Sequence, residues 1–142
     1  MNTQQMVRTH PDVKGDFSAL LIDCIDECFA CAQSCTSCAD ACLAEPQVDQ
    51  LRQCIRLNLD CADLCSAAGA LASRRTGSNE EVLLRTLEVC QLACSKCAEE
   101  CELHAKQHEH CRICAEACRR CEHACRMAMQ DVGGASGRIQ TN

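Results

Sequence analysis

The chain of 142 residues is long enough for one domain with one core. Its composition is unusual for a domain of this size, because it has 18 cysteines, only two phenylalanines, and no tyrosine or tryptophan. Sulfur must therefore fill much of the interior, where a buried thiol packs as a small hydrophobic group. The net charge of −6, without a basic patch, argues against nucleic acid as a partner.

The sequence predicts a cytoplasmic protein. Its first 17 residues contain neither the apolar stretch of an export signal nor a twin arginine, and no apolar run approaches the roughly 18 residues of a membrane span. Thiols stay reduced in the cytosol, so the cysteines indicate metal binding or redox chemistry and not a disulfide framework. We expect no membrane partner.

The first long helix carries the longest row of cysteines. Residues 1–15 contain helix breakers and are expected to be weakly ordered, although a short helical turn fits there. Asp16 or Ser18 then caps a helix that ends near residue 44, because the residue before Pro46 avoids the α conformation. Positions three and four apart share one helix face. The inward row is Phe17, Leu21, Cys24, Cys28, Cys31, Cys35, Cys38 and Cys42.

A second helix is predicted over residues 49–72, with fewer thiols. Its inward row is Leu51, Cys54, Asn58, Cys61, Cys65, Ala68 and Ala72. Asn58 stands where the periodicity demands an inward residue, so it is either a metal ligand or a buried amide that sets the helix register. A turn that contains Gly77 should follow this helix.

A third helix, capped by Ser78 or Asn79, continues the thiol row into a histidine. Its inward row is Leu83, Leu87, Cys90, Cys94, Cys97, Cys101 and His104. A reversal near residues 106–109 leads to a fourth helix, whose row is Cys111, Cys114, Cys118, Cys121, Cys125 and Ala128. The glycine-rich segment 132–142 is expected to be a flexible tail, so the bundle proper spans residues 16–131.

These four rows predict an all-α protein, an antiparallel up-down four-helix bundle with a cysteine-lined core. Successive cysteines within one predicted helix are three, four or seven residues apart, which is the spacing of a coiled-coil-like seam. Alternating helix directions gather apolar side chains at one end, which they close: Phe17, Leu21, Ala68, Ala72, Leu83, Leu87 and Ala128. We interpret the opposite end as the entrance; it gathers Cys42, Cys54, Cys101, His104, His108, His110, Cys111 and Cys114.

The thiol rows favour Cu(I) as the bound metal. Thiolates select soft metals, with Zn(II) and iron–sulfur clusters as rivals to Cu(I). One monovalent Cu(I) per thiolate neutralises a buried array, whereas about four Zn(II) ions would leave a large negative surplus. Two metal–sulfur bonds of about 2.3 Å span about 4.6 Å, a separation that cysteines four residues apart can approach. Capacity then approaches roughly one ion per cysteine, which is typical of a store.

Catalysis and inert packing explain the pattern less well. Ala, Val or Leu would pack without the risk of oxidation. The sequence contains no CxxCH haem motif and no Glu-x-x-His di-iron signature, and no βαβ pattern surrounds its CxxC motifs. We therefore expect no catalytic residues and no enzyme activity. A thiol-based zinc-binding or redox protein remains the alternative, and it differs in binding only a few ions.

The histidines divide by position. His104 continues the thiol row of the third helix and is expected to be a ligand. For His108 and His110, in the reversal, ligation and a surface position are both open. His123 lies between two cysteines but off their row, so a surface position is expected.

The alternating CxxxC and CxxC motifs, as in CIDECFACAQSCTSCADAC and CRICAEACRRCEHAC, resemble those of the bacterial four-helix-bundle copper storage proteins. The resemblance covers residues 17–130 and is greatest to the cytosolic branch of that family. It implies a homotetramer of bundles, each holding many Cu(I) ions that enter at the histidine-containing end. It also implies that Asn58 and the loop histidines supplement the cysteines as ligands.

Two further expectations concern partners. Apolar stripes beside the cysteine rows would be partly exposed in a monomer and favour a homo-oligomer: Ile22, Ile25 and Phe29 on the first helix, and Leu57, Leu64 and Leu71 on the second. A copper chaperone is a possible second partner, although the sequence does not identify the one that delivers copper.

Overall fold

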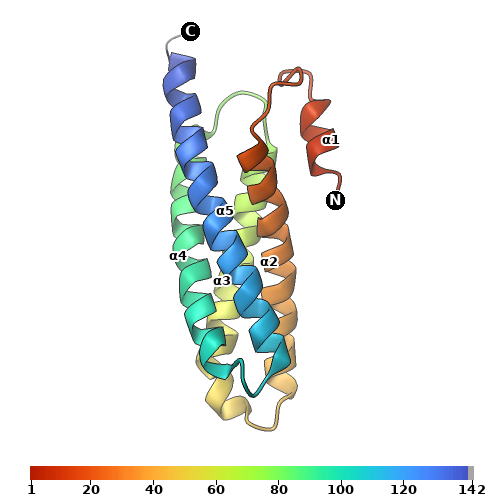
Figure 1. Ribbon diagram of the computed structural model, residues 1–142, viewed down its shortest axis with the longest axis vertical. Helices are drawn as coiled ribbons and strands as arrows, with labels where there is room; N and C mark the ends of the chain where they lie inside the picture. The colour runs from red at the N-terminus through yellow and green to blue at the C-terminus, as the bar shows by residue number, and fades with distance from the viewer. Residues whose placement is uncertain (141–142) are drawn as a thin grey trace.

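Four long helices lie side by side in one up-down bundle in the computed structural model (Figure 1). The elements are α1 (Thr3–Arg8), α2 (Ala19–Ala44), the 3₁₀ helix η1 (Val48–Leu51), α3 (Arg52–Ser73), α4 (Glu80–His104) and α5 (Glu109–Gln140). Each of the four long helices packs against two others, in the ring α2–α3–α4–α5, so they enclose one core. The structure describes the backbone of residues 1–140 and the side chains of residues 1–133. The predicted all-α four-helix bundle is confirmed.

The start and end of α2 follow from local sequence signals. Ser18 is the N-cap, and its hydroxyl accepts a hydrogen bond from the backbone N–H of Leu21. Of the two predicted caps, the serine is therefore the one that acts. Glu45, which precedes Pro46, adopts an extended conformation (φ −76°, ψ 142°) and ends the helix.

The loop between α3 and α4 is held by an asparagine. Asn79 is the N-cap of α4 by position, but its side-chain amide donates to the carbonyl of Leu71 near the end of α3. Gly77 supplies the left-handed conformation (φ 68°) that the turn requires. His10 also contacts this loop, since its Nε2 lies 3.0 Å from the Thr76 hydroxyl.

An apolar layer closes one end of the core, the upper end in Figure 1. Its fully buried members are Leu83, Leu87, Ala68, Ala72 and Ala128, and Leu21 is 4% exposed. Phe17 is partly buried and packs against them. The predicted closed end is thus confirmed. The loops α2–α3 and α4–α5 lie together at the opposite end.

The first stripe predicted to lie at the surface is largely internal. Ile22 and Ile25 are 6% and 1% exposed within the single chain, so the prediction that they would be partly exposed in a monomer was wrong for these two. The physical reason is that α1 packs against α2 and adds Val7 to the same core, which covers a face that a four-helix seam would leave open. Phe29 stays partly exposed.

The second apolar stripe keeps partial exposure, as predicted: Leu57, Leu64 and Leu71 are neither fully buried nor open.

The last helix extends beyond its predicted end at residue 131. Val132 is buried in the core, and the helical backbone of α5 continues through Gln140. Flexibility of the segment 132–142 stays a prediction, and residues 141–142 lie outside the described residues. None of the helices in the described part of the chain contains an apolar segment of the length that spanning a bilayer requires.

Candidate metal-binding core

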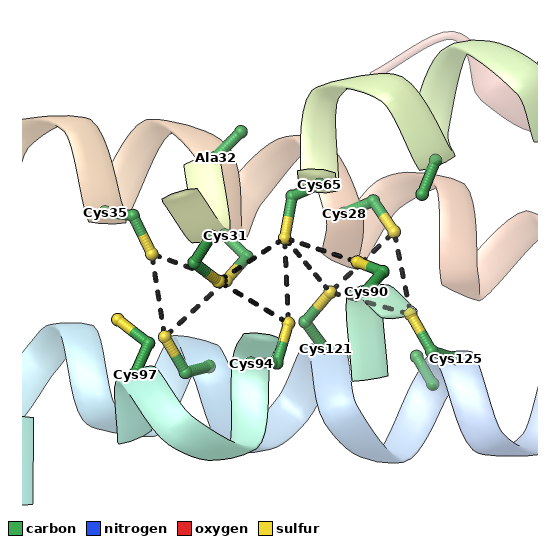
Figure 2. Close-up of a cluster of buried hydrophobic side chains, with 14 of the residues drawn as sticks. Cys28, Cys31, Ala32, Cys35, Cys65, Cys90, Cys94, Cys97, Cys121 and Cys125 are labelled. Atoms are coloured by element: carbon green, nitrogen blue, oxygen red, sulfur yellow. Dashed lines mark hydrogen bonds between the residues drawn. The ribbon is translucent and has the colours of Figure 1, made fainter. Parts of the chain in front are cut away.

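All 18 cysteines are free thiols, and none exposes more than 1% of its surface. α2 contributes six of them, α3 three, α4 four and α5 five. Figure 2 shows sulfur atoms from facing helices pointing toward one another along the middle of the bundle. The inward position predicted for every cysteine is the one that the structure shows.

The sulfur atoms form a continuous network between helices. Cys31 Sγ lies 3.8 Å from Cys35 Sγ on its own helix, 4.0 Å from Cys61 Sγ on α3 and 3.8 Å from Cys118 Sγ on α5. Cys65 Sγ lies 3.6 Å from the sulfur atoms of Cys90 and Cys94. Contacts of this kind join all four long helices through their thiols (Figure 2).

Groups of four thiols are close enough to share a metal ion. In each group the sulfur atoms all lie within 4.8 Å of one another, close to the roughly 4.6 Å that two metal–sulfur bonds span. Five of these groups are Cys28/Cys90/Cys121/Cys125, Cys31/Cys65/Cys94/Cys121, Cys31/Cys35/Cys61/Cys118, Cys35/Cys97/Cys114/Cys118 and Cys38/Cys42/Cys54/Cys111. Neighbouring groups share members, so a sulfur atom in this core can bridge two ions.

Asn58 is fully buried among the thiols, in the first half of α3. Its Oδ1 accepts hydrogen bonds from the thiols of Cys97 (3.1 Å), Cys114 (3.0 Å) and Cys101 (3.7 Å). Its Nδ2 donates to Cys54 Sγ at 3.5 Å. One amide thus joins thiols from α3, α4 and α5. These contacts fit both roles left open for this residue, ligand and organiser of the core.

The end of the core opposite the apolar layer contains a histidine pair on one carboxylate. Oε2 of Glu45, in the loop after α2, lies 2.8 Å from His108 Nδ1 and 2.9 Å from His110 Nε2. The other ring nitrogen of His110, Nδ1, lies 3.5 Å from Cys38 Sγ and 3.6 Å from Cys111 Sγ. The two rings stack with centroids 5.5 Å apart. His110 therefore connects buried thiols to a partly exposed carboxylate.

His104 makes a different contact. Its Nε2 lies 2.9 Å from Glu100 Oε2, one helical turn earlier on α4, and its side chain is 17% exposed. The structure places it at the predicted end of the core, paired with a carboxylate. His123 is exposed, as predicted, and its Nδ1 contacts Arg126.

Hydrogen bonds among the thiols shift their pKa values in both directions. Hydrogen bonds with Cys125 and Cys28 lower the pKa of Cys24 to about 5, against the opposing effect of burial. For Cys28 the bond to Cys121 is the main cause of a raised pKa. Contacts between thiols and burial thus give neighbouring cysteines in this core pKa values shifted in opposite directions.

At the histidine end, the carboxylate of Glu45 and the imidazole of His110 also shift each other's pKa. The hydrogen bond from His110 is the main cause that lowers the pKa of Glu45. Burial lowers the pKa of His110, but its contacts with Cys38 and Glu45 outweigh burial and raise it.

Helical periodicity did not find the two carboxylates of this end. Glu45 lies in a loop, where no repeat places a side chain, and Glu100 lies off the cysteine row of α4. The one available signal was a glutamate four residues before His104, a spacing that brings two side chains together on a helix.

Comparison with known proteins agrees with this geometry. Residues 18–130 match the family model described as Csp, copper storage protein. The solved structure of the copper storage protein Ccsp from Streptomyces lividans, loaded with 10 copper equivalents, superposes with a TM-score of 0.86 at 48% identity, covering 90% of this chain and 98% of that one.

A second structure of the same cytosolic storage protein, with five coppers, gives a TM-score of 0.77 at 51% identity, covering 78% of this chain and 92% of that chain. The uncharacterized cysteine-rich protein YhjQ of Bacillus subtilis is 36% identical over 66% of this chain and 81% of its own length. The family model spans most of the chain, and a copper-loaded storage protein has the same fold at 48% identity, so this chain belongs to the copper storage protein family.

Proposed function

We propose that this protein stores Cu(I) in the cytoplasm by binding many ions to the thiolates that line its bundle. The observation that carries the proposal is the sharing of cysteines between adjacent groups of four buried thiols. Shared sulfur atoms suit a chain of monovalent ions, each with few ligands. Separate Zn(II) ions would each need four thiolates of their own and leave the buried charge unbalanced. The copper-loaded relatives support the same choice.

The proposed ligands are the cysteines of the core together with the polar residues at its open end. The cysteines are Cys24, Cys28, Cys31, Cys35, Cys38, Cys42, Cys54, Cys61, Cys65, Cys90, Cys94, Cys97, Cys101, Cys111, Cys114, Cys118, Cys121 and Cys125. Asn58, His104, His108 and His110 supplement them. Capacity should approach roughly one ion per cysteine.

Copper enters at the histidine end in this proposal, because the opposite end is closed by leucine and alanine side chains. Soft, exchangeable ligands at the open end can take Cu(I) from a donor, which we propose is a copper chaperone. We also propose a homotetramer, whose contacts would cover the partly exposed leucines of α3. The family is one of storage, and no catalytic role is proposed.

An anaerobic titration tests storage. Reduced protein receives Cu(I) in the presence of a competing chelator, and the copper retained per chain is counted. Storage requires well over ten tightly held ions, whereas retention of a few zinc ions and little copper would favour the zinc or redox alternative. Replacing one group of four, Cys28, Cys90, Cys121 and Cys125, with alanine should remove about four ions. His123→Ala is the matched control: it removes a metal-binding side chain outside the core and should leave the count unchanged.

A further inference from the structure

One oxygen atom of Glu45 bonds to two histidines through different ring nitrogens. Its Oε2 lies 2.8 Å from Nδ1 of His108 and 2.9 Å from Nε2 of His110. Glu45 directly follows α2, His108 directly precedes α5, and His110 lies in the first turn of α5, so this contact joins two distant parts of the chain at the open end of the bundle.

An ionised carboxylate can only accept hydrogen bonds, so both contacting nitrogens must carry a hydrogen atom. The neutral imidazole of His108 is then the Nδ1–H tautomer, and that of His110 is the Nε2–H tautomer. The second nitrogen of His110, Nδ1, is left with a free lone pair. That atom is the one that lies 3.5 Å from Cys38 Sγ and 3.6 Å from Cys111 Sγ.

We propose that Glu45 is the positioning residue of the copper entrance: it fixes opposite tautomers in His108 and His110 and so points the lone pair of His110 Nδ1 at the thiols of Cys38 and Cys111. The inference rests on the proposed storage function and adds to it a residue that binds no copper itself. Carboxylates that orient a histidine ligand from behind play this part in many metal sites.

The arrangement defines the first binding step. An incoming Cu(I) ion binds His110 Nδ1 together with the sulfur of Cys38 or Cys111. As each copper–sulfur bond forms, the S–H bond breaks and its proton passes to solvent, while the ion stays monovalent. Cys38 and Cys111 belong to one group with Cys42 and Cys54, which receives the ion next. Without Glu45 the imidazole of His110 is free to rotate, and its lone pair meets the thiols only part of the time.

The first test uses apo protein and does not depend on copper. Nitrogen-15 NMR at about pH 8, where ordinary imidazoles are neutral, reports which ring nitrogen carries hydrogen. We expect His108 as the Nδ1–H form in the native chain and a change to a mixture in Glu45→Ala. Glu45→Gln, which offers one oxygen acceptor in a similar shape, should fall between the two. A His108 signal that is Nε2–H in the native chain, or unchanged in Glu45→Ala, would overturn the proposal.

The second test measures the initial rate of Cu(I) transfer from a chelator. Loss of a residue that orients a metal ligand typically lowers metal affinity or activity 10- to 100-fold. We therefore expect copper uptake by Glu45→Ala to be roughly tenfold slower, with a nearly unchanged final number of bound ions. Glu109→Gln is the matched control: it removes the same charge at the same end, but the carboxylate of Glu109 pairs with Arg112 and not with a histidine ring. A native rate in Glu45→Ala would overturn the proposal.

A double variant separates positioning from a merely structural effect. If Glu45 acts through the imidazole, adding Glu45→Ala to His110→Ala should slow uptake no further, whereas additive losses would contradict it. Should Glu45→Ala fold poorly by circular dichroism, the same comparison in Glu45→Gln decides the question. The final copper count distinguishes the two proposals: a native chain that retains few ions refutes storage, and a full count with equal rates refutes the role of Glu45 alone.

Discussion

Asn58 offers a sharp test of how the core is held together. Its amide is fully buried and contacts four thiols, from Cys54, Cys97, Cys101 and Cys114, at 3.0 to 3.7 Å. Asn58→Ala removes three heavy atoms from this core and takes away the amide that four sulfur groups share, although Cys54 and Cys101 still contact each other and Cys114 still contacts Cys35. Because S–H groups are weak donors, each lost bond costs less than an ordinary hydrogen bond. Together with the cavity, the expected loss in free energy of unfolding is about 2 kcal/mol.

Thermal unfolding of the reduced apo protein, followed by circular dichroism, measures this loss. A chain of this size should melt roughly 6 °C lower for a change of that order. Asn58→Leu fills most of the volume and should recover part of the loss. The control is Gln53→Ala, which removes an exposed amide from the same helix and should change stability by less than about 0.5 kcal/mol. An Asn58→Ala variant as stable as the native chain would refute the view that this amide organises the thiols.

Three further predictions follow from other contacts. Gly69→Ala should destabilise the fold despite the better helix propensity of alanine, because its Cβ would lie 2.9 Å from the ring of Phe29; adding Phe29→Leu should restore stability in the same melts. Arg119→Ala breaks the paired contacts with Glu102 between α5 and α4, but both side chains are 40% or more exposed, so the melts should register less than about 1 kcal/mol, and a larger loss would contradict that reasoning. Copper loading should release about one proton per Cu(I), which titration in weak buffer measures. The apparent affinity for Cu(I) should rise with pH, because protons compete with copper for the thiolates. Copper uptake without proton release would contradict binding by thiolates.

The sequence predicted the structure best in the segments where residues repeat at helical spacing. The three- and four-residue spacing of cysteines predicted the four long helices, their inward face and the closed end at Leu83 and Leu87, since burial of one face is what the periodicity encodes. Asn58 was found in the same way, because it stands in a row of cysteines. Its contacts with four thiols could not be predicted from the sequence, because they depend on how three helices align along the bundle axis.

Features outside the repeat were harder to predict. The histidine pair depends on Glu45, a loop residue 65 positions before His110, and no local pattern relates the two. The burial of Ile22 and Ile25 depends on the short N-terminal helix α1, in a segment that the sequence predicted to be weakly ordered. In both cases the missing information is tertiary: which distant segment covers a given face.

Copper-edge anomalous diffraction from crystals of the copper-loaded chain tests the central claim most directly. The account predicts a column of copper sites between the four long helices, each about 2.3 Å from cysteine sulfur atoms and beginning beside His110. Copper confined to exposed side chains such as His123, with the inner thiols still free, would contradict it.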